Sequence, residues 1–156
     1  SIPALSAGVT SSIMLFTELA VLGVFMVILG FFPSITILYL IPILLLEFLL
    51  IIGISLGLSV LNIKFKDVEF IWTVILSAGF FLTPIFYQFN MLPEKVQNIL
   101  QFSPMVQIVT MAHHVTLYGE LPPINSVLYS VTSVSIIVVV GYLIFRKYQT
   151  RIVEEI

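Results

Sequence analysis

The fold of this chain is decided by one long apolar stretch, residues 35–61, which reads ITILYLIPILLLEFLLIIGISLGLSVL. Within it only Glu47 can carry a charge. A hydrocarbon core about 30 Å thick needs roughly 20 residues of helix to cross it, because each helical residue rises about 1.5 Å. The stretch therefore predicts a transmembrane helix.

Three further stretches meet the same length test, at about residues 5–31, 70–87 and 124–145. Their apolar runs are continuous, whereas the strands of a transmembrane barrel alternate between apolar and polar residues over roughly 10 positions. The predicted fold class is therefore all-α. We expect a polytopic membrane bundle of four transmembrane helices in a single domain that covers residues 1–156.

The composition also predicts that lipid is the solvent of this chain. Hydrophobic residues make up 60% of it and charged residues 9%, whereas a soluble domain has about 25% charged residues. A net charge of −2 without a basic patch argues against nucleic-acid binding, and the absence of cysteine excludes disulfides and thiolate metal sites. Because the chain begins at Ser1 with no charged segment before its first apolar stretch, we interpret it as a fragment of a longer protein.

The basic residues predict which side of the membrane each loop occupies. Five of the six lysines and arginines lie either in the loop with Lys64 and Lys66 or in the tail 146–156, and only Lys95 falls on the opposite side. Such residues stay preferentially on the cytoplasmic side of a membrane. We therefore expect a multi-pass protein whose C-terminus is cytoplasmic.

The segment 93–118, on the predicted external side, does not read as a solvated loop. Pro93 is a favoured first residue of a helix, and apolar residues recur at helical spacing after it. Pro104 interrupts the pattern at Ser103, and a second apolar pattern follows. Each piece is too short to span a bilayer, so we predict a helical hairpin that either re-enters the membrane or lies at its surface as a cap.

Two carboxylates, Glu18 and Glu47, fall near the middles of the first two predicted helices. A charge there costs at least about 2.5–3.5 kcal/mol, so these residues are expected to face the bundle interior, water or a partner. They could form a proton relay or line a pathway. The simpler interpretation is a neutral acid bonded to a neighbouring helix, since the four helices offer no lysine, arginine or histidine as a relay partner.

Small residues at regular spacing predict close helix packing. Gly53 and Gly57 form a GxxxG pattern, and the last helix carries Ser126, Ser130, Ser133 and Gly141 on one face. His113 and His114 do not predict a metal site, because adjacent helical positions point about 100° apart and no third ligand is in view. The sequence contains no phosphate-binding loop and no hydrolase motif, so we expect the chain to bind neither metal nor nucleotide.

Aromatic residues gather where the third predicted helix ends, around Thr83 and Pro84: Phe80, Phe81, Phe86, Tyr87 and Phe89. Such a cluster is typical of a membrane interface, where aromatic rings anchor a helix. Flat apolar faces in a row could also guide sugar rings.

Two motifs in this region carry a family resemblance. Residues 61–68, LNIKFKDV, are similar to a cytoplasmic turn of the form N-x-[KR]-[FY]-[KR]-D-[VI], and residues 80–87, FFLTPIFY, to a helix end of the form FF-x-[ST]-P-I-[FW]-Y. In this order and spacing the motifs resemble the C-terminal half of the ABC-2 type permeases, particularly exporters of lipid-linked polysaccharides such as O-antigen, teichoic acid and capsule. The chain departs from that family at Ser103, where asparagine is usual, and at His113, where arginine is frequent.

The resemblance implies the last four helices of a six-helix permease in the bacterial cytoplasmic membrane, a homodimer with its export channel at the seam. It implies a separate ATPase subunit that binds the ATP and magnesium, so this chain would hold no cofactor and catalyse nothing. The turn with Lys64, Lys66 and Asp67 would lie near that ATPase, and the external hairpin with Pro93, Pro104 and His113 would form the gate. The substrate pathway would be bordered by Phe80, Phe81, Phe86 and Tyr87. Alternatives are an ABC-2 permease for a drug or lipid, a proton-coupled secondary transporter that uses Glu18 and Glu47, and a membrane-embedded assembly partner with no pathway.

Overall fold

The computed structural model divides the chain into two compact units, Ser1–Ile35 and Thr36–Ile156. In the first unit, the described residues between 17 and 28 are helical, and Gly30 adopts a positive φ of 76°. Glu18 and most of the predicted helix 5–31 lie outside the described residues, and the account below concerns the second unit. The structure describes residues 17, 20–21, 23–24, 27–28, 30, 35–65, 67–85, 87 and 89–154.

Every regular element in the described residues is helical, which confirms the predicted all-α class. A short 3₁₀ turn, η1 (Ile35–Tyr39), leads into the long helix α2 (Leu40–Lys64), and the chain ends in α6 (Ile124–Glu154). Pro42 is tolerated in the first turn of α2, because backbone N–H groups there have no intrahelical partner.

The two long helices are apolar but mostly not buried within the chain. The segments Ile35–Asn62 and Ile124–Tyr148 are long and apolar enough to cross a membrane, and 17% of the most apolar window of each is buried. A core helix of a soluble protein would instead be mostly buried. Their length and exposed apolar surface therefore favour a place in a membrane, and they coincide with the predicted crossings at 35–61 and 124–145.

Helix α3 (Val68–Leu82) is shorter than the predicted third crossing at 70–87. Its 15 residues reach about 22 Å, less than the hydrocarbon thickness of roughly 30 Å. The helix ends at Leu82 because Thr83, the residue before Pro84, takes an extended conformation with ψ of 129°. The chain then folds back, and the Tyr87 hydroxyl donates to the carbonyls of Phe81 and Leu82, 3.0 Å from each.

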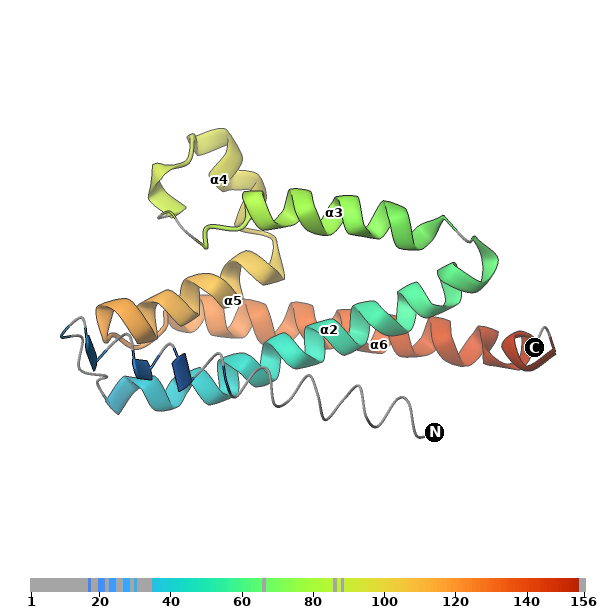
Figure 1. The fold of residues 1–156 in the computed structure, drawn as a ribbon, viewed down its shortest axis with the longest axis horizontal. Coiled ribbons are helices and arrows are strands. Elements are labelled where there is room, and N and C mark those ends of the chain that lie inside the picture. Colours follow the sequence, from blue (N-terminus) through green and yellow to red (C-terminus); the bar gives the residue numbers. More distant parts are fainter. Residues whose placement is uncertain are drawn as a thin grey trace. The chain divides into compact units, whose positions relative to one another are not determined.

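Figure 1 shows that α2 and α6 run in the same direction and that α3 runs back the opposite way. Because α2 and α6 run in the same direction, the start of α6 lies at the same end of the bundle as the start of α2. The chain must therefore cross back from the end of α2 before α6 begins. Helix α3 makes that return within the part of the chain that the structure describes. The last turn of α2 is closed by a hydrogen bond of 2.9 Å from the Phe65 N–H to the Leu61 carbonyl, and the Val68 N–H of α3 donates to the Phe65 carbonyl at 3.2 Å.

Glycines bring α2 and α6 together. A Cβ added at Gly53 would lie 2.9 Å from the Val138 backbone nitrogen, and one added at Gly141 would collide with the Gly53 carbonyl oxygen. Gly57 differs, because nothing among the described residues lies within 4 Å of a Cβ built there. The close approach therefore rests on Gly53 and Gly141, a pairing that the GxxxG spacing alone does not predict.

Two short helices occupy the segment predicted as a hairpin, 93–118. These are α4 (Glu94–Leu100) and α5 (Pro104–His113), followed by a π-turn, η3 (His114–Tyr118). Ser103 separates them in an extended conformation, with Pro104 as the first residue of α5.

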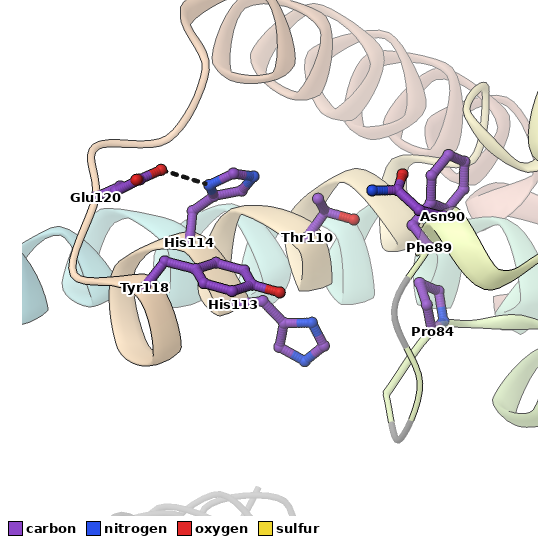
Figure 2. Close-up of a pocket in the computed structure, with 8 residues that line it drawn as sticks. All are labelled: Pro84, Phe89, Asn90, Thr110, His113, His114, Tyr118 and Glu120. Carbon is purple, nitrogen blue, oxygen red and sulfur yellow. Dashed lines mark ion pairs between the residues drawn. The ribbon is translucent and has the colours of Figure 1, made fainter. Parts of the chain in front are cut away.

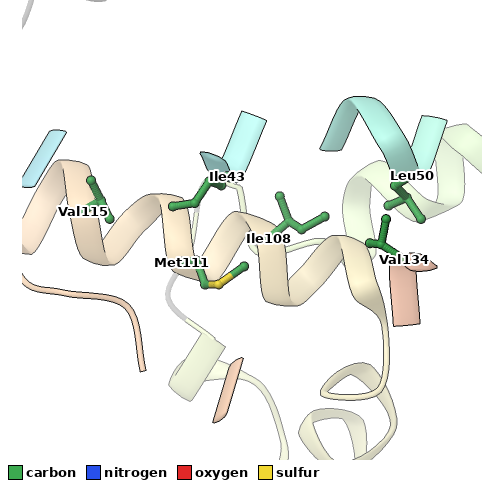
Figure 3. Close-up of a cluster of buried hydrophobic side chains, with 6 residues drawn as sticks. All are labelled: Ile43, Leu50, Ile108, Met111, Val115 and Val134. Carbon is green, nitrogen blue, oxygen red and sulfur yellow. The ribbon is translucent and has the colours of Figure 1, made fainter. Parts of the chain in front are cut away.

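Helix α5 lies against the N-terminal halves of α2 and α6 (Figure 1). The contact is an apolar cluster in which each side chain is at most 5% exposed (Figure 3). Its members are Ile43 and Leu50 of α2, Ile108 and Met111 of α5, Val115 of η3 and Val134 of α6. The hairpin is thus attached to the bundle by packing along the side of both long helices.

Hydrogen bonds fasten the stretch formed by α5 and η3 near both of its ends. The Thr36 hydroxyl donates to the Val115 carbonyl at 3.3 Å, and the Tyr129 hydroxyl of α6 donates to the carbonyl of Phe102 at 2.7 Å. Phe102 lies at the turn between α4 and α5, so Tyr129 holds the tip of the hairpin beside the second turn of α6.

Replacing Tyr129 with phenylalanine is expected to loosen this tip without unfolding the bundle. The change removes one donor, and a hydrogen bond of this kind contributes about 0.5–1.5 kcal/mol. Amide hydrogen exchange should therefore accelerate around residues 101–107 and not in the middle of α6. Tyr142→Phe is the matched control, since Tyr142 is exposed on the same helix. Equal exchange in the two variants would show that the Tyr129 bond does not hold the tip.

Candidate functional site

A cavity of about 320 Å³ lies between the segment after α3 and the polar face of α5 and η3 (Figure 2). The segment after α3 includes a short 3₁₀ turn, η2 (Phe89–Met91). The cavity is lined by Pro84, Phe89, Asn90, Thr110, His113, His114, Tyr118 and Glu120.

Helical spacing explains why α5 and η3 present a polar face to the cavity. Thr110, His114 and Tyr118 are four residues apart, so they form one stripe along the helix surface. Met111 and Val115 form a different stripe and are buried against α2 and α6. One short segment thus packs the bundle with one face and lines the cavity with the other.

The backbone turn at the end of η3 places Glu120 beside the cavity. Gly119 has a φ of 64°, a left-handed conformation that a side chain would disfavour. Both the Gly119 and Glu120 N–H groups donate to the His114 carbonyl, in the wide geometry of a π-turn. As a result the Glu120 carboxylate Oε2 lies 3.7 Å from Nδ1 of His114.

Several polar groups in the cavity can still form hydrogen bonds. Nδ1 of His114 is buried and has no hydrogen-bond partner among the described residues, because the 3.7 Å separation from Glu120 is too long for one. The Thr110 hydroxyl donates to the Val106 carbonyl at 2.8 Å, which leaves its oxygen free to accept. Figure 2 shows the Asn90 amide directed from η2 toward the α5 side chains.

The cavity carries little charge. None of the described residues that line it is a lysine or an arginine, and Glu120 is the only carboxylate. Burial, with the neighbouring His114 as the smaller cause, lowers the pKa of His113, which lies outside the two long helices. His113 is therefore mainly neutral at pH 7 and offers both a donor and an acceptor.

Most of the residues selected from the sequence lie elsewhere. Phe80 and Phe81 are exposed on α3, with their rings in a T-shaped contact at 5.6 Å, and neither lines the cavity. Tyr87 folds back on the end of α3, and Phe86 lies outside the described residues. Of the three hairpin positions Pro93, Pro104 and His113, the cavity includes His113 alone.

The remaining candidates are spread over the cytoplasmic turn and α2. Asp67 precedes α3 and Lys64 ends α2, while Lys66 lies outside the described residues. Glu47 is half-buried in α2, away from the cavity. No group of three potential metal ligands is present among the described residues.

Among the lining residues, sequence reasoning proposed only His113 for a functional site and missed the other seven, including Asn90, Thr110, Tyr118 and Glu120. The four-residue spacing of Thr110, His114 and Tyr118 was a usable signal for a polar helix face. Glu120 gave no such signal, since its place depends on the π-turn and on the left-handed Gly119. Asn90 reaches the cavity only through the tertiary arrangement of η2 and α5.

No family model matches this sequence. The chain is similar to two curated proteins of Klebsiella pneumoniae, both named O-antigen export system permease protein RfbA. It is 31% identical to one over 136 residues and 32% identical to the other over 132 residues, which is 86% and 83% of this chain. The chain spans about half the length of these relatives, 52% and 50%. The chain is thus a membrane protein that resembles transport permeases over most of its length.

Proposed function

We propose that this chain is the C-terminal part of the transmembrane subunit of an ATP-driven exporter of the ABC-2 type, and that its cargo is a lipid-linked polysaccharide. Similarity to two proteins named as O-antigen export permeases supports this cargo. The apolar, mostly unburied helices α2 and α6 support a place in the membrane, with the basic C-terminal tail on the cytoplasmic side.

The observation that carries the proposal is the two-faced helix α5. It is too short to span a bilayer, yet its apolar face packs along two helices that can. Its other face presents Thr110, His113 and His114 to a cavity. Polar surface at membrane depth is tolerated where it is buried in protein or lines a water-filled space, so a re-entrant hairpin beside a pathway accounts for both faces.

The energy for export would enter through a separate ATPase, because the sequence contains no phosphate-binding loop. A nucleotide can shift the bundle only through a difference in its affinity for two conformations of the assembly. The turn from α2 to α3, with Lys64, Lys66 and Asp67, is the proposed contact with that partner. A second copy of the permease would complete the channel and cover part of the exposed apolar surface of the helices.

The exposed aromatic residues at the end of α3 provide the test of the proposed pathway. Replacing Phe80 and Phe81 together with alanine is expected to reduce polysaccharide export by a factor of about 5 to 150, because ring contacts contribute about 0.5–1.5 kcal/mol each. Export is measured as polysaccharide that reaches the cell surface, normalised to the amount of permease in the membrane. Both rings are exposed, so the thermal unfolding temperature should hardly change.

The matched control is Phe70→Ala, since Phe70 is 75% exposed at the opposite end of the same helix. Its export should remain at the level of the unmodified protein. Unchanged export in the Phe80 and Phe81 variant, or an equal loss in the Phe70 variant, would contradict the proposed role of these rings.

A further inference from the structure

We propose that the cavity between η2 and α5 is a binding subsite for one ring of an uncharged, hydroxyl-rich sugar, and that it discriminates against acidic sugars. The proposal rests on the proposed function and extends it, because it assigns selectivity for part of the cargo to a defined group of side chains. This group consists of the cavity-lining residues given above, with Thr110 and His114 among them.

The size of the cavity suits a small ligand. Its volume of about 320 Å³ is at the lower end of the range for small-molecule sites, roughly 300–1,000 Å³. One monosaccharide ring is therefore a better match than a longer piece of polymer. Further rings would continue outside the cavity.

The lining combines the two kinds of surface that a sugar ring requires. Hydroxyl groups both donate and accept, and so do the Asn90 amide and the imidazole of neutral His113. The Thr110 hydroxyl, whose hydrogen is donated to the Val106 carbonyl, can accept a further hydrogen bond. The apolar C–H face of a sugar can rest on an aromatic ring, and Phe89 and Tyr118 supply two rings.

An unsatisfied group inside the cavity points to a ligand as well. Nδ1 of His114 is buried and has no hydrogen-bond partner in the described residues. Leaving such a group without a hydrogen bond costs about 1–3 kcal/mol. A ligand hydroxyl that bonds to it removes this cost, so the hydrogen bond contributes more to binding than one formed with a solvent-exposed group. The Tyr118 ring, 5.6 Å from the imidazole, restricts the direction from which that hydroxyl can approach.

Charge determines which sugars are accepted. Among the described residues that line the cavity there is no lysine or arginine, while Glu120 contributes one carboxylate. A uronic acid or a phosphorylated sugar would bring a second negative charge without a cation to compensate it. Selectivity between related ligands is often achieved by such an unpaired like charge.

Binding can be tested on the intact permease in nanodiscs, together with its ATPase. The probes are galactotriose and trigalacturonic acid, which share a ring skeleton and differ in the carboxylates. We expect saturable galactotriose binding with a Kd on the millimolar scale by saturation-transfer NMR. Trigalacturonic acid should bind about two- to fivefold more weakly, because the Glu120 side chain is 70% exposed and solvent screens its repulsion.

Three substitutions assign the binding to the cavity. Thr110→Val and His114→Phe keep the shape of each side chain and remove polar atoms, so each should weaken galactotriose binding about fivefold or more. Glu120→Gln should selectively improve trigalacturonic acid binding. Glu94→Gln is its control, because Glu94 is an exposed carboxylate on α4 that does not line the cavity. Thermal unfolding of each variant verifies that it is folded.

The proposal would be overturned by the absence of saturable galactotriose binding, by binding that Thr110→Val and His114→Phe leave unchanged, or by a preference for trigalacturonic acid. It would also be overturned if spermidine bound better than galactotriose, since the cavity would then select cations. Failure of the subsite and of the proposed function can be told apart. If export depends on Phe80 and Phe81 but the cavity binds no sugar, only the subsite fails, whereas sugar binding without any polysaccharide export contradicts the function.

Discussion

Replacing Gly141 with alanine is expected to destabilise the bundle by about 1–3 kcal/mol, because a Cβ there meets the Gly53 carbonyl oxygen of the facing helix. The obstacle is backbone, which cannot rotate away as the end of a flexible side chain can. Helices α2 and α6 must therefore separate at their closest point. Gly53→Ala should act in the same direction, since its Cβ would lie 2.9 Å from the Val138 nitrogen.

The matched control for this prediction is Gly57→Ala. Nothing among the described residues lies within 4 Å of a Cβ at Gly57, and alanine stabilises a helix interior by roughly 0.5–1 kcal/mol relative to glycine. The two substitutions should therefore have opposite signs. Reversible unfolding in mixed micelles measures both free energies. If Gly141→Ala were as stable as Gly57→Ala, the two helices would not be packed through their glycines.

The second large effect is expected from Met111→Ala on helix α5. Met111 is 1% exposed and belongs to the cluster that joins α5 to α2 and α6. Truncation leaves a cavity and removes many van der Waals contacts, so the free energy of unfolding should fall by about 2–5 kcal/mol. The hairpin should lose more stability than the pair of long helices, because α2 and α6 keep their own contact through Gly53 and Gly141.

Cysteine accessibility can locate this effect, since the natural sequence contains no cysteine. A single cysteine introduced at Val106, which is 2% exposed, should react faster with a water-soluble maleimide in the Met111→Ala background. Ile99→Ala is the control, because Ile99 lies on α4 and is 73% exposed. Equal labelling rates in the two backgrounds would show that Met111 does not hold α5 in place.

Much of the fold could be predicted because the deciding information is local. The apolar stretches 35–61 and 124–145 are long enough for a membrane span, and the structure places α2 and α6 there. Proline acts on the residue before it, so the break at Ser103 was predicted from the sequence. The same rule applies at Thr83, but the third helix was predicted to continue to Tyr87.

The third helix shows where local reasoning was incomplete. Apolar character continues from Phe70 to Tyr87, yet α3 ends at Leu82, and Tyr87 turns back to bond its last carbonyls. Hydropathy records whether a residue tolerates lipid, but the helix end depends on backbone geometry at Thr83 and Pro84. The aromatic cluster was therefore predicted as one surface, while the structure directs Phe81 and Tyr87 differently.

By itself, the sequence determined that this protein is helical and belongs in a membrane. It also determined that an interrupted apolar segment lies between the third and fourth apolar stretches. These properties depend on composition and on neighbours within a few residues. Only the tertiary structure decided that Gly53 meets Gly141, that the Phe102 carbonyl binds Tyr129, and that Asn90 and Glu120 join the α5 side chains around one cavity. The physical reason is that each of these contacts joins separate elements, so it forms only after the helices have packed against one another.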